Sequence, residues 1–136
     1  MDNFSNGLQI SAAGLKAQSG RLRVIAENIA NTDSTAVTAG GDPYRRQVPI
    51  FSSLLDRSTG ISTVELGDIR TDPTPFTLEF DPGHPGADDS GYVKLPNVNP
   101  LVEMMDLREA QRSYEANLGT MDLLRSMASA TLQILE

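Results

Sequence analysis

The chain has 136 residues and a net charge of −7, which argues against nucleic acid as a partner, because phosphate backbones are bound mainly through Lys and Arg. It has no cysteine, which excludes a disulfide framework, a thiolate metal site and a thiol nucleophile. No apolar run approaches the roughly 20 residues of a membrane-spanning helix, and the polar first residues lack the features of a cleaved signal peptide.

The first predicted element is a long helix, from about residue 3 or 5 to about residue 31. Apolar side chains recur in it every seven residues: Leu8, Leu15, Leu22 and Ile29. This interval puts them on one stripe of the helix, as in the seam of a coiled coil. Gly7, Gly14 and Gly20 interrupt the helix. Each costs roughly 1 kcal/mol relative to Ala, so the helix must pack against a partner.

Two asparagines, Asn28 and Asn31, stand at the polar end of this helix. Short polar side chains favour helix ends because they compete for backbone hydrogen bonds. The same amides also suit close packing, in which they bond the backbone of a neighbour. The residues alone leave both interpretations open.

The middle of the chain is predicted to be β-rich, because all eight prolines fall between Pro43 and Pro100 and forbid a long helix there. Strand-like pieces cover residues 44–51, 61–66, 76–80 and 92–95, with Gly- and Pro-rich turns between them. We expect a hairpin or a small module of three to four strands.

A second long helix is predicted to start with Asn99 as N-cap and Pro100 in the first helical position, and to reach Glu136. A heptad row runs along it: Leu107, Ala110, Tyr114, Asn117, Met121, Leu124, Ala128, Thr131 and Leu135. A second apolar row lies beside the first: Met104, Leu118 and Leu132. This second row could meet a further neighbour.

The predicted fold is therefore mainly α with a small β module, in which the long N- and C-terminal helices pair as a coiled coil. The expected division is an N-terminal assembly helix (1–35), a middle segment (36–98) and a C-terminal assembly helix (99–136). Because the helix pair leaves apolar surface uncovered, we expect subunits to pack together. The predicted interface residues are Leu8, Leu15, Leu22, Asn28, Ile29, Asn31, Leu107, Tyr114, Asn117, Leu118, Met121, Leu124 and Leu135.

No catalytic, cofactor or metal site is predicted. The only histidine, His84, lies among acidic residues, but Pro and Gly on both sides indicate a turn. Arg45 and Arg46 could contact an anion, although surface arginines at a strand start are the favoured interpretation.

Several stretches resemble the bacterial flagellar axial proteins. The segment around Asn28-Ile29-Ala30-Asn31 is similar to their Asn-rich N-terminal signature. Three further stretches, residues 40–46, 81–98 and 112–117, resemble the proximal-rod branch of this family. Together these stretches are spread over nearly the whole chain.

The resemblance implies a structural subunit of the flagellar basal-body rod, the drive shaft between membrane ring and hook, with no enzymatic activity and no cofactor. The implied partners are copies of itself, other rod proteins, membrane-ring or rod-adaptor proteins at the rod base, and the flagellar type III export apparatus. The implied location is the rod crossing the periplasm, reached without signal cleavage. The alternative is a soluble coiled-coil adaptor or export chaperone, which would form a stable dimer in solution.

Overall fold

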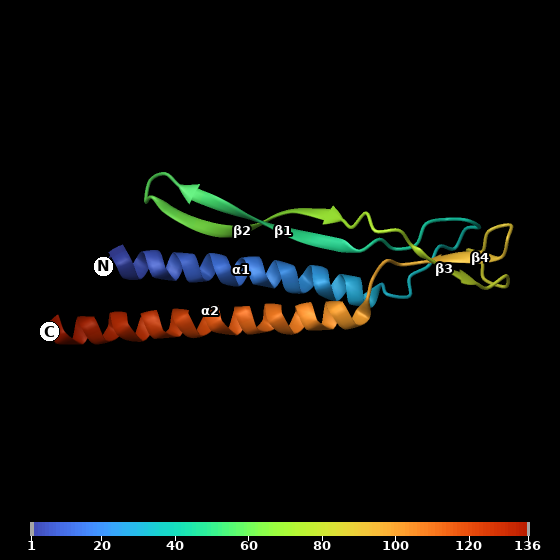
Figure 1. Cartoon of the computed structure of the whole chain (residues 1–136). Coiled ribbons are helices and arrows are strands. Elements are labelled where there is room, and N and C mark those ends of the chain that lie inside the picture. The colour runs from blue at the N-terminus through green and yellow to red at the C-terminus, as the bar shows by residue number, and fades with distance from the viewer. Residues whose placement is uncertain (1, 136) are drawn as a thin grey trace. The chain divides into compact units, whose positions relative to one another are not determined.

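The computed structural model describes residues 2–135 and has two long helices with four strands between them in sequence (Figure 1). The helices are α1 (Asp2–Ala30) and α2 (Pro100–Leu135). The strands are β1 (Gln47–Asp56), β2 (Ile61–Thr71), β3 (Thr77–Phe80) and β4 (Tyr92–Leu95). The predicted fold class, mainly α with a small β module, is confirmed.

The strands form two separate two-stranded sheets, β1–β2 and β3–β4, so the described residues contain no sheet of three or four strands. β3 and β4 are antiparallel, with Thr77 opposite Leu95 and Phe80 opposite Tyr92. Pro49 is tolerated inside β1 because both strands of a two-stranded sheet have a free edge. β1 begins at Gln47 rather than at residue 44, because the Arg46 backbone N–H donates to the side chain of Asn97 instead of to a strand.

The chain divides into two compact units. The first contains residues 2–22, 49–68 and 108–135, and the second contains residues 23–48 and 69–107. Both long helices and both strands of the β1–β2 hairpin contribute to each unit.

In the first unit, α1 lies between α2 and the β1–β2 hairpin (Figure 1). The glycines of α1 lie close to side chains of both neighbours. A Cβ on Gly7 would lie 2.9 Å from Leu124 Cδ1, and one on Gly14 would lie 2.9 Å from Asn117 Oδ1. On the hairpin side, a Cβ on Gly20 would lie 2.5 Å from Leu66 Cδ2. The glycines that weaken the isolated helix therefore let it pack closely against two neighbours.

The heptad leucines of α1 lie beside this contact rather than at its centre. Leu8, Leu15 and Leu22 are half-buried, whereas the small residues Ser11 and Ala17 are buried. A helix held between two neighbours at short range needs small side chains on the facing surfaces, and the heptad pattern of large residues does not reveal these positions.

In the second unit, the start of α2 has the predicted cap. Asn99 Oδ1 accepts hydrogen bonds from the backbone N–H groups of Leu101 at 3.1 Å and Val102 at 3.5 Å. Pro100 occupies the first helical position, where a missing N–H removes no helical hydrogen bond.

The close approach at Gly14 predicts opposite effects for two Gly→Ala substitutions. Gly119→Ala should stabilise the chain by about 1 kcal/mol, because Ala favours a helix and a Cβ there meets nothing within 4 Å. Gly14→Ala should destabilise it by about 1 kcal/mol, because the new methyl group overpacks the contact with Asn117. Urea unfolding followed by circular dichroism measures both, and Asn117→Ser should recover the loss in the Gly14→Ala background. Equal stabilisation by both alanines would show that Gly14 does not mark a tight contact.

Candidate assembly surface

In the second unit, Asn28 is 1 % exposed and every polar atom of its side chain is bonded. Its Oδ1 accepts from the hydroxyl of Tyr44 at 2.8 Å and from the backbone N–H of Gln47 at 2.9 Å. Its Nδ2 donates to the Gln47 carbonyl at 2.8 Å and to Glu103 Oε2 at 3.2 Å. One side chain thus joins α1 to β1 and α2, using the full capacity of an amide.

Glu103, in the first turn of α2, is 0 % exposed and is the charged partner of Asn28. Its Oε1 accepts from Arg46 Nε in an ion pair. The Arg46 guanidinium also lies 3.4 Å from Asp72 Oδ2 and 3.7 Å from Asp106 Oδ2. The favoured prediction of surface arginines is therefore wrong for Arg46, because a buried carboxylate requires a cation beside it.

Asn97 ties the loop before α2 to the same region. It accepts from the Arg46 backbone N–H at 2.7 Å and donates to the carbonyl groups of Asp72 at 3.1 Å and Thr74 at 3.0 Å. The Asp72 backbone N–H in turn donates a hydrogen bond to the Arg46 carbonyl at 2.8 Å. The side chains linked in this way are called the polar cluster below: Asn28, Tyr44, Arg46, Asp72, Asn97 and Glu103.

Burial and charge act on the groups of the polar cluster. Burial, with the nearby charges of Glu27 and Glu103, raises the pKa of Tyr44. Hydrogen bonds from the Thr74 hydroxyl and backbone, together with Arg46, lower the pKa of Asp72. Burial opposes the charge of Arg46, but the hydrogen bonds and charges of Glu103 and Asp72 outweigh it and raise the pKa of Arg46. The cluster therefore favours a neutral tyrosine, an ionised aspartate and a protonated arginine.

The other arginine of the pair, Arg45, lies over a ring. Its guanidinium carbon is 4.1 Å from the centre of the Phe76 ring, and its Nη1 donates to the Asp72 carbonyl at 2.9 Å and the Thr74 carbonyl at 3.1 Å. Arg45 thus helps to fix the segment that follows β2.

His84 holds a turn, as the surrounding Pro and Gly predicted. Its Nδ1 accepts from the Gly86 backbone N–H at 2.9 Å, which leaves Nε2 as the donor to the Thr35 hydroxyl at 2.9 Å. A Cβ on Gly86 would run into the carbonyl oxygen of Ala36, so a glycine is needed for the two loops to meet. Among residues 2–135, no group of three or more His, Cys, Asp or Glu side chains could hold a metal ion.

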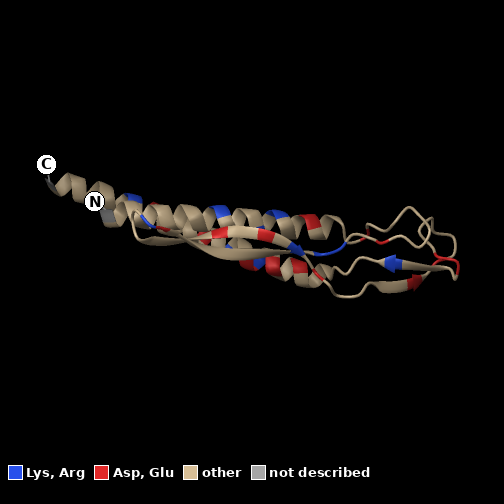
Figure 2. Cartoon of the chain, turned by 90° about the horizontal axis from the view of Figure 1, so that it is seen from above, with Lys and Arg blue, Asp and Glu red and all other residues tan. Residues whose placement is uncertain are grey.

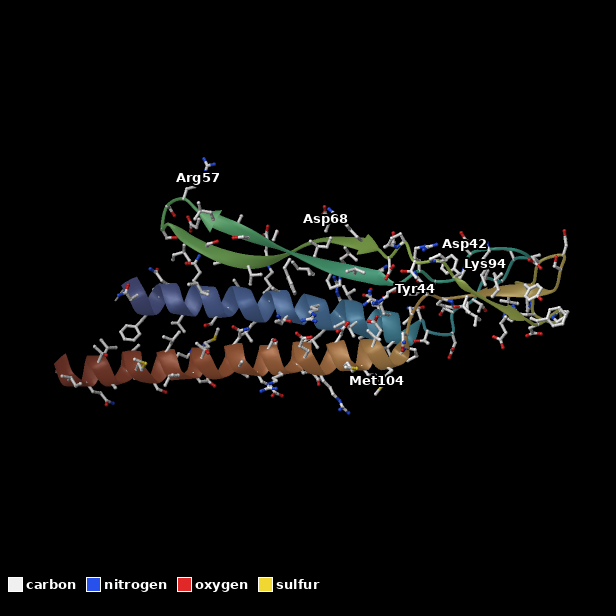
Figure 3. All side chains as sticks on the ribbon, viewed as in Figure 1. Asp42, Tyr44, Arg57, Asp68, Lys94 and Met104 are labelled. Carbon is white, nitrogen blue, oxygen red and sulfur yellow. The ribbon has the colours of Figure 1, made fainter. Side chains whose placement is uncertain are left out.

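A further ion pair of this unit, separate from those of Arg46, lies at the surface. Lys94 of β4 donates to Asp42 Oδ1 at 2.9 Å, and both residues are labelled in Figure 3. The pair lowers the pKa of Asp42 through the hydrogen bond and the charge of Lys94. Such an exposed pair adds little to stability.

The residues predicted to form an assembly interface differ in exposure. Asn28 is buried, and Leu118 is exposed. Asn31 is half-buried and makes only local bonds, from its Nδ2 to the Glu27 carbonyl and from the Ser34 hydroxyl to its Oδ1. The side chain of Leu135 lies outside the described residues. The remaining members are half-buried: Leu8, Leu15, Leu22, Ile29, Leu107, Tyr114, Asn117, Met121 and Leu124.

Much of the apolar surface of α2 is uncovered. The exposed large side chains of this helix are Leu101, Val102, Met104, Met105, Leu118, Leu123, Met127, Leu132 and Ile134. No charged residue occurs in the described part of α2 after Arg125, and this end of the helix is tan in Figure 2. An apolar surface of this extent on a chain of this size is typical of a protein that packs against other subunits. Within residues 2–135, neither helix is both long and apolar enough to cross a membrane.

The sequence did not single out Glu103 and Asn97, and for Arg46 it favoured a surface position over the contact with an anion. A signal for Glu103 was present, because it precedes Ala110 by seven residues and so extends the heptad row of α2 towards its start. A carboxylate in a row of mostly apolar residues requires a buried partner, and the sequence does not say which cation supplies it.

The family of the chain follows from its matches to known proteins. Residues 8–36 match the family described as flagella basal body rod protein, and residues 89–134 match the flagellar basal body rod FlgEFG protein C-terminal family. These matches cover most of α1 and α2 and define the class as flagellar rod proteins.

Relatives of full length identify the branch. The chain is 46 % identical over 136 residues to the flagellar basal-body rod protein FlgC of Agrobacterium fabrum, covering 100 % of this chain and 98 % of that protein. It is 40 % identical to FlgC of Aquifex aeolicus, covering 98 % and 97 %, and 38 % identical to FlgC of Salmonella typhimurium, covering 95 % and 96 %. The chain belongs to the FlgC family and is a structural subunit of the flagellar basal-body rod.

Proposed function

We propose that this chain polymerises through its terminal helices into the proximal part of the rod, and that this rod transmits torque from the membrane ring to the hook. It acts as a structural component without catalysis. The observation that carries the proposal is the full-length similarity to FlgC rod proteins. The uncovered apolar surface of α2 supports it, because such a surface needs neighbouring subunits.

The polar cluster and the exposed surface have different roles in this proposal. Asn28 and the half-buried residues of the predicted interface hold the helices in the arrangement that a neighbour recognises. The exposed residues, among them Leu118, supply new contacts. An open polymer results when one patch binds a different patch on the next copy and the rotation does not close.

The proposed partners are copies of this chain, other rod proteins, and ring or adaptor proteins at the rod base. The chain reaches the periplasm through the flagellar type III export apparatus, without a cleaved signal peptide. A rod of many parallel helices is stiff enough to carry torque, because packed interiors deform little.

Substitution of an exposed leucine tests assembly without disturbing the fold. Leu123 is 61 % exposed, so Leu123→Asp should leave the circular dichroism spectrum and thermal unfolding of the purified chain unchanged. In cells that carry only this variant, we expect loss of swimming and of rods in isolated basal bodies, while the variant is still exported. Gln133→Asp, which adds the same charge at an exposed polar position of α2, is the control and should swim normally. Normal swimming of the Leu123→Asp strain would contradict the proposal that this part of α2 lies in a subunit interface.

A further inference from the structure

Two exposed helix faces of this chain match each other in period and in the size of their side chains, and their edges carry opposite charges. On α2, Leu118 is 42 % exposed and Leu132, fourteen residues later, is 50 % exposed. Glu115 and Asp122 are exposed and flank Leu118 at positions −3 and +4, which are neighbouring positions on a helix surface. Arg125, seven residues from each of the two leucines, is also exposed, so this face has two leucines on either side of an arginine and two acidic residues at its edge.

The matching face of α1 is formed by small residues. Ser5, Ala12 and Ser19 recur every seven residues and are all exposed. Lys16 and Arg23 are exposed and flank Ser19 at −3 and +4. No acidic residue occurs between positions 3 and 26, so the edge of this face is basic where the edge of the α2 face, at Glu115 and Asp122, is acidic. Small residues leave room for the large side chains of a partner.

We propose that these two faces bind each other between successive copies of the chain, the α2 face of one copy on the α1 face of the next. This inference rests on the proposed function and names its interface. The occupant is a second copy, because each face has its complement on the same chain. Binding one face to a different face also gives an open polymer rather than a closed dimer.

The alignment of the two faces follows from the direction in which each helix runs. Within the chain the helices are antiparallel, since Gly7 contacts Leu124 and Gly14 contacts Asn117. Copies repeated along a rod keep the same polarity, so α1 of one copy and α2 of the next are also antiparallel. With Leu118 placed on Ser19, Arg125 meets Ala12 and Leu132 meets Ser5, because Leu118 and Leu132, like Ser5 and Ser19, are separated by fourteen residues, or about 21 Å.

The same register pairs the charges. Moving forward on one antiparallel helix corresponds to moving backward on the other, so Asp122 comes within one residue step of the level of Lys16. Glu115 likewise comes level with Arg23. Each exposed pair contributes little energy alone, but like charges at these positions would oppose binding, so the pairs select the register.

Disulfide cross-linking tests the interface, because the chain has no cysteine of its own. Lys16→Cys and Asp122→Cys are produced together in cells that lack the unmodified chain, and isolated basal bodies are oxidised. We expect a covalent dimer when both variants are present and none when either is present alone. Lys16→Cys with Ser129→Cys, an exposed position one heptad further along α2, is the control and should give no dimer. A dimer from either single variant, or none from the pair in basal bodies that contain both, would overturn the proposal.

Charge reversal tests the same contact without cysteines. Lys16→Glu and Asp122→Lys should each reduce swimming, and the double variant should restore it, while all three purified chains unfold at the same temperature. Lack of restoration would count against the interface. If the unmodified chain is itself absent from basal bodies, the proposed function fails. If it is present but neither the cross-link nor the restoration occurs, only the interface fails.

Discussion

Glu103→Ala is expected to lower the free energy of unfolding by about 3 kcal/mol, because it removes one partner of a buried ion pair. Arg46 would lose its bond to Oε1, and Asn28 Nδ2 would lose its second acceptor. The remaining contacts of Arg46 with Asp72 and Asp106, at 3.4 and 3.7 Å, keep the loss from being larger. The melting temperature of the purified chain should fall by roughly 10 °C.

Glu109→Ala is the matched control, because it removes an ion pair of the same helix that is exposed. Glu109 Oε2 lies 3.5 Å from Arg21 Nη2, and its side chain is 68 % exposed. Such pairs contribute about 0–1 kcal/mol, so the melting temperature should change little. Equal losses in the two variants would mean that burial of Glu103 does not determine its contribution.

The long helices could be predicted from the sequence because their signals are local. Asn99 and Pro100 define the start of α2 through backbone chemistry that depends on a few neighbouring residues. β4, predicted for residues 92–95, is bounded in the same way by local turn residues. The paired helices and the β-rich middle could be predicted from the sequence for this reason.

The packing of α1 could not be predicted, because it depends on contacts distant in sequence. In the sequence, Gly14 and Gly20 only lower the helix propensity of α1. In the structure, the missing Cβ at each leaves room for Asn117 and Leu66, which lie more than 40 residues away in the sequence. The period of seven identified large residues but did not show that the tightest contacts use the smallest ones.

The polar cluster joins residues from stretches that resemble the axial proteins, but the resemblance itself does not show that these residues contact one another. Three stretches that resemble the axial proteins each supply at least one of its members, among them Asn28, Arg46 and Asn97. Their sequence separation, from 18 to 69 residues, hides the link, because hydrogen bonds between distant side chains leave no periodic pattern. The cluster gives a structural role to these residues of the stretches.

The two asparagines at the end of α1 give a matched pair for a second test, because they differ in burial and not in chemistry. Asn31 is half-buried and bonds only its own helix end, through the Glu27 carbonyl and the Ser34 hydroxyl. Asn31→Ala should therefore lower the free energy of unfolding by about 1 kcal/mol or less. Asn28, by contrast, bonds groups outside its own helix with both ends of its amide.

Asn28→Ala is expected to lower the free energy of unfolding by about 3 kcal/mol, because the Gln47 N–H and the Tyr44 hydroxyl lose their acceptor and two acceptors lose their donor. Asn28→Asp should cost at least as much at neutral pH, since it puts a carboxylate oxygen where Nδ2 now lies, 3.2 Å from Glu103 Oε2. Urea unfolding of both variants beside Asn31→Ala measures the difference. If Asn28→Ala costs no more than Asn31→Ala, the amide does not hold α1, β1 and α2 together, and Asn28 is instead free to act at a subunit interface.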